Sequence, residues 1–380
     1  MKVKIRIGNE VKEYTGAWED HTLLEVFQEL GITQVHAPCG GNGTCKKCLV
    51  TVEGLGEVLS CQTQCKDDMC VTVAEEQKSA IAENGNCYLY PADAGDGLLA
   101  ACDIGTTTVV CHLLDGATGV RLCTVSAPNA QRSFGADVIS RIQASVDSGL
   151  DKLQSAIVDQ INGMLVQLKQ KAGRTEEIRR LAVAGNTVMS HLFCGLSPES
   201  IGVAPFTPLS LFGENYDAKQ IGIEGCETVY VVPSIAGYVG GDIVADLAAV
   251  QMHSSVLAED GEKETLMLDI GTNGEMVLGK SGSYVCCATA AGPAFEGAEI
   301  AMGMPAASGA ISKVWLEDGK ICCSTINDAP AVGICGSGLI DALAVFLETE
   351  LLDETGLIAD EDEVEEAYAG YLGEDEDGTC

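Results

Sequence analysis

A glycine-rich loop that carries three cysteines sets the strongest constraint on what this chain can fold into. The loop runs from Cys39 to Cys48 and reads CGGNGTCKKC, and a fourth cysteine, Cys61, follows downstream. A loop that wraps a metal centre must bring its backbone close to the ligand sulfurs, and glycine permits the positive φ angles that such a path requires. Thiolates grouped in this way are soft ligands that suit zinc or iron–sulfur clusters. We therefore predict a metal centre near the N-terminus.

The spacing of these cysteines favours an iron–sulfur cluster. Three ligands on one loop, followed by a distant fourth, are nearly the plant-type arrangement for a [2Fe–2S] cluster. A zinc site usually groups its ligands as two close pairs, and a disulfide is not expected in a chain without signs of export. Lys46, Lys47 and the loop N–H groups would stabilise the extra negative charge of a reduced cluster. The predicted cluster ligands are Cys39, Cys45, Cys48 and Cys61.

Composition places the chain among acidic globular proteins. Its 380 residues suffice for more than one domain, and 46% of them are hydrophobic. The formal net charge of −34 excludes nucleic acid and anionic membrane surfaces as main partners, because both would repel the chain. The first residues form an alternating strand rather than a signal peptide, and no apolar run is long enough to span a membrane. The 18 cysteines then predict reduced thiols and a cytoplasmic protein, as in an anaerobe.

The first part of the chain has the pattern of a small α+β domain. Residues 2–8 and 11–15 alternate like a β-hairpin. Residues 21–30 have the apolar spacing of a helix. Short strands are expected at 49–53 and 71–73, after the cysteine loop. Two strands, a helix, a cluster loop and further short strands resemble the β-grasp fold of plant-type ferredoxins.

A motif of aspartate, glycine and threonine between two strands occurs twice in the rest of the chain. It reads DIGTT at 103–107 and DIGTN at 269–273. Glycine and threonine at a hairpin tip offer N–H and hydroxyl donors to phosphate oxygens, and an aspartate ending the preceding strand can hold Mg²⁺ beside them. Unrelated Gly-Thr turns are the alternative, but repetition after two apolar strands favours a nucleotide site. The predicted catalytic residues are Asp103 and Asp269, and the predicted nucleotide-binding residues are Gly105, Thr106, Thr107, Gly271, Thr272 and Asn273.

These motifs together resemble a known combination of domains. The paired loops resemble the phosphate 1 and phosphate 2 motifs of the ASKHA superfamily (acetate and sugar kinases, heat-shock chaperone ATPases, actin). A plant-type ferredoxin domain ahead of such a fold resembles the ATP-dependent reductive activators of corrinoid proteins. The implied fold class is an α+β β-grasp domain followed by an α/β two-lobed actin-like ATPase domain of ribonuclease H-like type, incomplete in its second lobe. The stretches that carry the family resemblance are 129–131, 135–142, 184–192, 205–206, 233–242, 291–297 and 333–341.

The resemblance also predicts domain boundaries. Members of this kind carry a late glycine-rich adenosine motif, whereas this chain stops soon after a helix expected at 338–352. We expect either a fragment of a longer protein or a truncated protein with impaired nucleotide binding. The predicted domains are a [2Fe–2S] ferredoxin-type domain (1–75), a linker (76–97) and an ASKHA-type ATPase domain (98–380), with a first lobe at 98–262 and a partial second lobe at 263–380.

The resemblance implies an iron–sulfur electron-transfer enzyme. Its cofactors would be a [2Fe–2S] cluster and ATP with Mg²⁺, and its reaction would return Co(II) corrinoid proteins to Co(I). The implied partners are a corrinoid (cobalamin) protein of a methyltransferase system and an upstream low-potential electron donor. The alternative is a ferredoxin-type electron-transfer module whose degenerate ASKHA domain binds a partner and has no ATPase activity. A small-molecule kinase is disfavoured, because a kinase has no use for a ferredoxin domain.

Four further residues have two interpretations each. His191 lies in an apolar stretch with helical spacing, where a packed core histidine is favoured over a metal ligand or a base. Asp242 follows two glycines and suits either a helix cap or a residue that faces nucleotide or metal. Glu275 and Glu296 are compatible with polarising a hydrolytic water or with surface and capping roles. No Gly-x-x-x-x-Gly-Lys-Ser/Thr sequence occurs, so a P-loop enzyme is excluded.

Overall fold

The computed structural model describes most of the chain, and the described residues form two compact units. Those up to Asp269, together with Glu275–Ala288, make the first unit; Ile270–Gly274 and those from Thr289 onward make the second. No helix among them is long and apolar enough to cross a membrane. The described residues are 1–8, 10–32, 34–35, 37, 41, 43, 48–74, 95–253, 265–271, 273–280, 283–290, 300, 302–360, 362–375 and 378–379.

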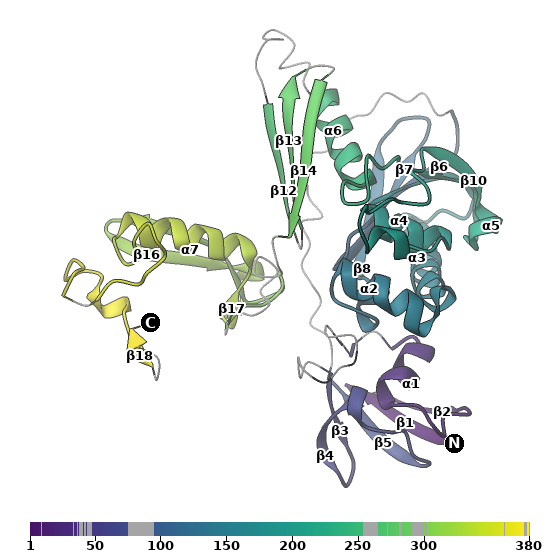
Figure 1. Cartoon of the computed structure of the whole chain (residues 1–380), viewed down its shortest axis with the longest axis horizontal. Coiled ribbons are helices and arrows are strands. Elements are labelled where there is room, and N and C mark those ends of the chain that lie inside the picture. The colour runs from purple at the N-terminus through teal and green to yellow at the C-terminus, as the bar shows by residue number, and fades with distance from the viewer. Residues whose placement is uncertain are drawn as a thin grey trace. The chain divides into compact units, whose positions relative to one another are not determined.

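The N-terminal domain is a five-stranded sheet with one helix (purple in Figure 1). Its elements are β1 (Lys2–Ile7), β2 (Glu10–Thr15), α1 (Leu23–Glu29), β3 (Leu49–Val52), β4 (Gly56–Leu59), the 3-10 turn η1 (Ser60–Gln62) and β5 (Met69–Val73). The strand order is β2-β1-β5-β3-β4, with β1 antiparallel to β2 and parallel to β5. Thr22 begins α1 with a capping box to Glu25, and α1 buries Val26 and Phe27 in the domain core. The predicted hairpin, helix and later strands are confirmed.

The middle of the chain is built on a six-stranded sheet. Its strands are β6 (Leu98–Ile104), β7 (Thr108–Asp115), β8 (Arg121–Pro128), β9 (Ile178–Gly185), β10 (Glu214–Asp217) and β11 (Cys226–Val231). In the order β10-β11-β9-β6-β7-β8, β6, β7 and β8 form an antiparallel meander. On the other side of β6, β9 is parallel to β6 and β11 is parallel to β9. This mixed order is that of the predicted ribonuclease H-like fold.

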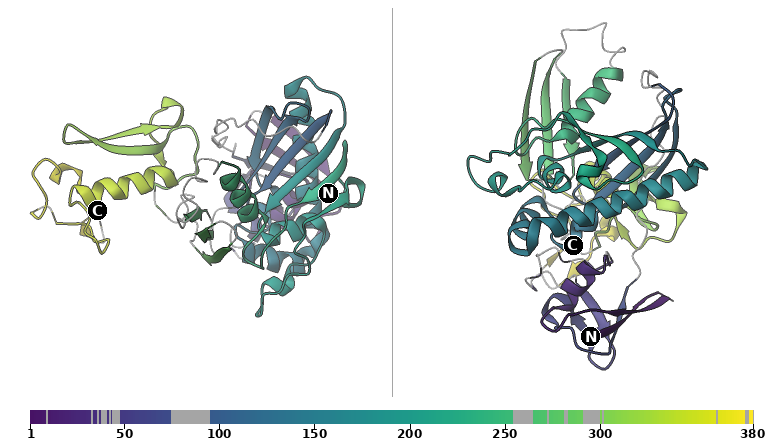
Figure 2. Two further views of the ribbon diagram at one scale, coloured as in Figure 1. Left: turned by 90° about the horizontal axis from the view of Figure 1, so that it is seen from above. Right: turned by 90° about the vertical axis from the view of Figure 1, so that its right-hand side faces the viewer.

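Helices cover this sheet and complete its core. They are η2 (Ala130–Ser133), α2 (Val138–Ala144), the π-helical turn η3 (Ser145–Gly149), α3 (Leu150–Ala172), α4 (Thr187–Cys194), η4 (Glu199–Ile201), α5 (Ala218–Ile221) and α6 (Gly241–His253). The long helix α3, teal in the right-hand view of Figure 2, packs on β7 and β8. Along β6 the residues Leu98, Ala100, Cys102 and Ile104 are buried in this core. Because strand residues alternate between faces, Asp103 projects from the opposite face.

Three strands follow at the end of the first unit. They are β12 (Thr265–Ile270), β13 (Asn273–Lys280) and β14 (Ser283–Ala290), in the order β12-β13-β14. Val277 on β13 forms a small apolar cluster with Val239 and Ile243, and Ile243 lies in the first turn of α6. This cluster packs β13, which follows the second Asp-Gly-Thr motif, against α6.

The second unit contains a smaller sheet and one long helix (yellow-green in Figure 1). Its elements are β15 (Ala310–Glu317), β16 (Lys320–Thr325), η8 (Ile326–Asp328), β17 (Gly333–Ile334), α7 (Gly336–Glu348), η9 (Ala369–Tyr371), β18 (Glu374–Asp375) and β19 (Gly378–Thr379). The helix predicted at 338–352 was placed too late. It ends at Glu348 because the Thr349 hydroxyl donates back to Val345 O and Glu350 takes a left-handed φ of 59°.

Candidate functional site

Two of the four predicted cluster ligands are brought together by strand pairing. Cys48 directly precedes β3, and Cys61 lies in η1, directly after β4. The antiparallel pairing of β3 with β4 places these two ends side by side, and Ser60 N donates to Cys48 O at 2.9 Å. The two sulfur atoms are 3.2 Å apart, and both cysteines are buried and outside any disulfide. Cys39 and Cys45 lie outside the described residues, so their assignment stays a prediction.

The surroundings of the two thiols fit an iron–sulfur cluster. Gly41 and Gly43 have φ angles of 89° and 75°, as a loop that turns towards sulfur requires. Gln62 Nε2 donates to Gly41 O at 3.0 Å and to Cys61 Sγ at 3.6 Å, and so fastens the loop beside the thiols. The fully buried Ser60 hydroxyl has no hydrogen-bond partner within the described part of the chain. A buried donor without an acceptor is costly, and a cluster sulfur would supply that acceptor.

The first Asp-Gly-Thr motif forms the tip between β6 and β7. Thr106 is only 7% exposed. Its hydroxyl oxygen accepts from Asn186 Nδ2 at 3.1 Å, and Gly105 O accepts from Asn129 Nδ2 at 2.7 Å. Thr107 O accepts from Asn129 N at 2.9 Å. The predicted phosphate loop is therefore a supported tip, held from the side of the protein interior.

Five carboxylates gather near this tip. Asp103 comes from β6, Asp242 and Asp246 come from the start of α6, and Asp269 and Glu275 come from β12 and β13. They are close enough to perturb one another electrostatically. Asp242 lies there because Gly240 allows the entry of α6 to pass against Asn186: a Cβ at Gly240 would lie 2.4 Å from Asn186 Cα. The predicted catalytic pair, Asp103 and Asp269, is thus brought together with three further carboxylates.

Burial, and after it the crowding of these groups, raises their pKa values. Burial, followed by Asp242, Asp246 and Asp269, raises the pKa of Asp103 to about 7. Burial, followed by Asp242 and Asp269, raises the pKa of Glu275 to about 7. Burial and the same two neighbours raise the pKa of Asp246 to about 6. Asp103 and Asp246 keep access to water, and water screens the electrostatic effect of neighbouring charges. Glu275 is only 7% exposed, so its raised pKa is the least reduced by screening.

The carboxylate set suits a hydrated magnesium ion. Among the described residues no three metal-binding side chains converge closely enough to hold a bare ion. Mg²⁺ keeps several waters and is bound through one or two carboxylates together with substrate phosphates. Carboxylates spread around a phosphate-binding tip fit that mode, since a cation would also relieve their mutual repulsion.

The second motif forms the turn between β12 and β13. Gly271 N donates to Asn273 O at 2.9 Å, which closes the turn. Thr272 lies outside the described residues. The nucleotide contacts predicted for Gly271, Thr272 and Asn273 stay predictions.

His191 is a structural residue, as the sequence favoured. It is fully buried on α4, and its Nδ1 donates to Thr187 O at 2.7 Å. Its Nε2 accepts from Leu209 N at 3.2 Å and from Ser210 N at 3.3 Å. Burial lowers the pKa of His191. The neutral ring therefore fastens a loop and has no ring nitrogen left for a metal.

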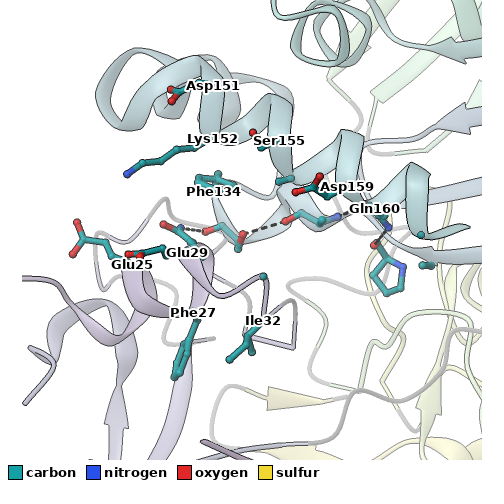
Figure 3. Close-up of a pocket in the computed structure, with 18 of the residues that line it drawn as sticks. Glu25, Phe27, Glu29, Ile32, Phe134, Asp151, Lys152, Ser155, Asp159 and Gln160 are labelled. Carbon is teal, nitrogen blue, oxygen red and sulfur yellow. Dashed lines mark hydrogen bonds between the residues drawn. The ribbon is translucent and has the colours of Figure 1, made fainter. Parts of the chain in front are cut away.

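A cavity of about 640 Å³ lies between α1 and the segment formed by η2 and α3 in the first unit (Figure 3). Glu25, Glu29, Asp151 and Asp159 line it. Lys152 also lines it, but the acidic groups outnumber this cation, so the cavity is unsuited to phosphate. Beside it, Gln28 Nε2 donates to Ser133 O at 2.6 Å, so the cavity marks a contact between the ferredoxin-type domain and the six-stranded domain.

Sequence reasoning missed several residues of both sites. Asp246 lies four residues after Asp242 on α6, and this spacing places both on one helix face, which is a signal that the sequence offered. Asn129, Arg141 and Asn186 donate to Gly105 O, Thr106 O and the Thr106 hydroxyl, respectively. All three lie in stretches that carry the family resemblance, but nothing in the sequence shows that they hold the tip. Gln62 offered no signal beyond its place after a ligand.

Comparisons with known proteins agree with this architecture. Family models match in chain order: a 2Fe-2S iron-sulfur cluster binding domain over residues 7–76, the RACo middle region over 98–255 and the C-terminal domain of RACo, the ASKHA domain, over 263–374. The "Corrinoid activation enzyme RamQ" of Eubacterium limosum is 32% identical over 89% of this chain and 70% of its own length. The "[Co(II) methylated amine-specific corrinoid protein] reductase" of Methanosarcina barkeri is 28% identical over 67% of this chain and 51% of its own length.

A solved structure is similar across the whole chain. The "Reductive activator for corrinoid,iron-sulfur protein" matches 99% of this chain and 77% of its own, with a TM-score of 0.63 and 31% identity. The predicted order of a ferredoxin-type domain and an ASKHA domain is confirmed. The chain therefore belongs to the family of RACo-type corrinoid activation enzymes, which combine an N-terminal 2Fe-2S domain with a C-terminal ASKHA domain.

Proposed function

We propose that this protein reduces the Co(II) corrinoid protein of a methyltransferase system to Co(I), using an electron held at its [2Fe–2S] site and free energy from Mg–ATP. One observation carries the proposal. The thiol pair of Cys48 and Cys61 and the supported tip at Gly105–Thr107 with its five carboxylates lie in one compact unit of the chain. An upstream low-potential donor would refill the site. Eighteen cysteines support a reducing, cytoplasmic setting.

The energetic need explains why a nucleotide site would accompany a ferredoxin-type domain. A plant-type cluster supplies one electron at about −400 mV. If the cobalt couple lay ~200 mV lower, the transfer would cost roughly 5 kcal/mol. A ligand that binds one of two conformations about 10⁴-fold more tightly than the other can shift their equilibrium by that amount. Differential binding of Mg–ATP and its products to the two conformations would therefore supply enough free energy for this electron transfer.

At the cluster site the chain provides ligands and charge stabilisation. Cys48 and Cys61 would bind as thiolates, and their sulfur atoms, 3.2 Å apart, are close enough for both to hold one cluster. Gln62 Nε2 and the Ser60 hydroxyl are the nearby neutral donors. Hydrogen bonds from such donors stabilise the more negative, reduced state and so raise the reduction potential.

At the nucleotide site the chain provides anion and cation binding. The tip Gly105–Thr107 would receive phosphate oxygens on N–H and hydroxyl donors. Asp103 and Asp269 would orient Mg²⁺ through its waters. Glu275 lies near Asp242 and Asp269, and its pKa is raised to about 7. It would therefore be the group that accepts a proton from an attacking water, because a general base works best near the ambient pH.

A hydrogen-bonded route connects the two sites. Gln28 on α1 donates to Ser133 O in η2. Asn129, the N-cap of η2, accepts from Gln131 N and donates to Gly105 O at the tip. A change at the tip on hydrolysis can therefore reach α1 through η2. Helix α1 also contacts η1, which carries Cys61.

The test is an anaerobic assay of cobalt reduction and ATP hydrolysis in one mixture. The cluster-loaded protein, a chemical reductant and a Co(II) corrinoid protein should form Co(I), seen by absorbance, only with Mg–ATP. Cys61→Ser should stop electron transfer and Asp103→Asn should stop hydrolysis. The matched controls Cys70→Ser, on strand β5, and Glu227→Gln, exposed on β11, should do neither. Equal Co(I) formation with and without ATP would contradict the proposal and favour a plain electron-transfer module.

A further inference from the structure

A buried arginine lies directly beneath the phosphate-binding tip. Arg141 on α2 is fully buried. Its Nη2 donates to Thr106 O at 2.5 Å, its Nε to Gly135 O at 2.9 Å and its Nη1 to Met189 Sδ at 3.0 Å. A guanidinium stays protonated at any physiological pH, so a full positive charge sits under the tip. Burying a charge is costly, and such a placement calls for a functional reason.

The donors beneath the tip orient its peptide groups. Arg141 holds Thr106 O, and Asn129 holds Gly105 O with its side chain and Thr107 O with its backbone N–H. A trans peptide directs its C=O and its N–H to opposite sides. Fastening the carbonyls inward therefore directs the N–H groups of the following residues outward. This is the orientation that an anion-binding tip needs.

The charge of Arg141 has a second consequence at this place. Asp103, Asp242, Asp246, Asp269 and Glu275 all lie nearby, and five carboxylates alone would repel a triphosphate. A fixed cation in a region of low dielectric acts strongly on anions a few ångströms away. Because Arg141 touches the tip through Thr106 O, its field acts at the phosphate position.

We propose that Arg141 is a positioning residue that orients the Gly105–Thr107 tip and gives it a fixed positive charge, so that the site prefers nucleotides with more phosphate groups. This inference rests on the proposed nucleotide site and deepens it. It predicts that the preference for ATP over AMP depends on the positive charge at position 141. A neutral side chain that replaces only the hydrogen bonds of Arg141 should not maintain this preference.

The experiment measures ATP and AMP binding by calorimetry, with Mg²⁺ and the cluster-loaded full chain. Arg141→Gln, which keeps donors and removes the charge, should weaken ATP binding roughly tenfold or more and AMP binding much less. Arg141→Lys should restore the ATP-to-AMP ratio even where both affinities fall. Arg180→Gln, which removes an exposed arginine from β9, should leave both unchanged. Cluster absorbance and the unfolding midpoint report on folding.

The outcomes separate the possibilities. Equal losses for ATP and AMP in Arg141→Gln, with no rescue by lysine, would mean a merely structural brace and overturn the inference. Should Arg141→Gln not fold, Asn186→Asp places a negative charge against the Thr106 hydroxyl and must lower the ATP-to-AMP ratio; an unchanged ratio overturns the inference. If wild-type protein binds neither ATP nor AMP, the nucleotide site itself is overturned. If wild-type protein binds them and the variants bind them with the same affinities, only the role of Arg141 is overturned.

Discussion

Glu275 makes a measurable prediction, because its ionisation opposes folding when no cation is present. The side chain is 7% exposed, and burial with the nearby Asp242 and Asp269 raises its pKa from 4.5 to about 7. A carboxyl with a raised pKa binds more protons in the folded state, so stability falls as pH rises between the unfolded and folded pKa values. The cost is absent below about pH 4.5, ~1.5 kcal/mol at pH 5.5 and ~3 kcal/mol at pH 8.

Glu275→Gln removes this cost and should stabilise the protein in EDTA. At a few degrees per kcal/mol for a domain of this size, the unfolding midpoint should rise by roughly 6–12 °C at pH 8 and by about half of that at pH 5.5. Scanning calorimetry of the cluster-loaded protein measures both shifts. The same substitution should lower the ATPase rate, since Glu275 would no longer accept a proton.

The control is Glu227→Gln on β11, where the carboxylate is exposed and the expected change is within about 0.5 kcal/mol. Mg²⁺ should raise the wild-type midpoint more than that of Glu275→Gln, because the cation relieves repulsion that the variant lacks. A midpoint equal to wild type at pH 8, or an equal rise at both pH values, would refute the assignment of a crowded, ionisable Glu275.

Three further predictions concern the cluster, the route between the sites and the core. Ser60→Ala removes a buried hydroxyl that has no partner among the residues the structure describes; redox titration should show a potential lower by roughly 30–60 mV, and an unchanged potential would mean that the hydroxyl does not reach the cluster. Gln28→Ala removes the bond to Ser133 O and should reduce ATP-dependent Co(I) formation several-fold while basal ATP hydrolysis stays constant; equal losses of both would contradict the route through η2. His191, whose pKa is lowered by burial, binds fewer protons folded than unfolded, so it contributes stability that is lost as pH falls below about 6.5. Urea unfolding of His191→Gln should show a smaller acid-side loss than wild type, and parallel curves would contradict the neutral ring.

The fold could be predicted largely from local pattern. The helical spacing of residues 21–30, the apolar run that becomes β6 and the repeated Asp-Gly-Thr motif are each patterns that one segment displays by itself. The closeness of Cys48 and Cys61 was expected from the cysteine spacing for the same reason, whereas their role as cluster ligands stays a prediction. The end of α7 was misplaced because the apolar pattern continues beyond Glu348, whereas the backbone leaves the helix at Thr349.

The residues that hold the site in place could not be predicted from local sequence patterns. Asn129, Arg141 and Asn186 come from three separate segments and meet only at the tip. Their side chains are not distinguished by periodicity, and a buried arginine in an otherwise ordinary helix has no sequence signature. Gln62 likewise gains its role only where η1 meets the cysteine loop. Long-range hydrogen bonds of this kind depend on tertiary packing, which single-sequence patterns do not encode.

The placement of charge explains why the first unit tolerates an unfavourable cluster of carboxylates. Asp103, Asp242, Asp269 and Glu275 raise one another's ionisation cost, and no described residue group holds a bare cation there. Natural proteins accept such costs at functional sites, where ligands offset them. A hydrated Mg²⁺ with a polyphosphate would bring the missing positive charge from one side, while Arg141 supplies it from beneath the tip. On the proposed function, the stability lost to the carboxylates in the empty state would be recovered on binding of Mg–ATP. The nucleotide-free and nucleotide-bound states would therefore differ in free energy at the carboxylate site. Because η2 connects this site to the ferredoxin-type domain, that difference would be available to the cluster domain.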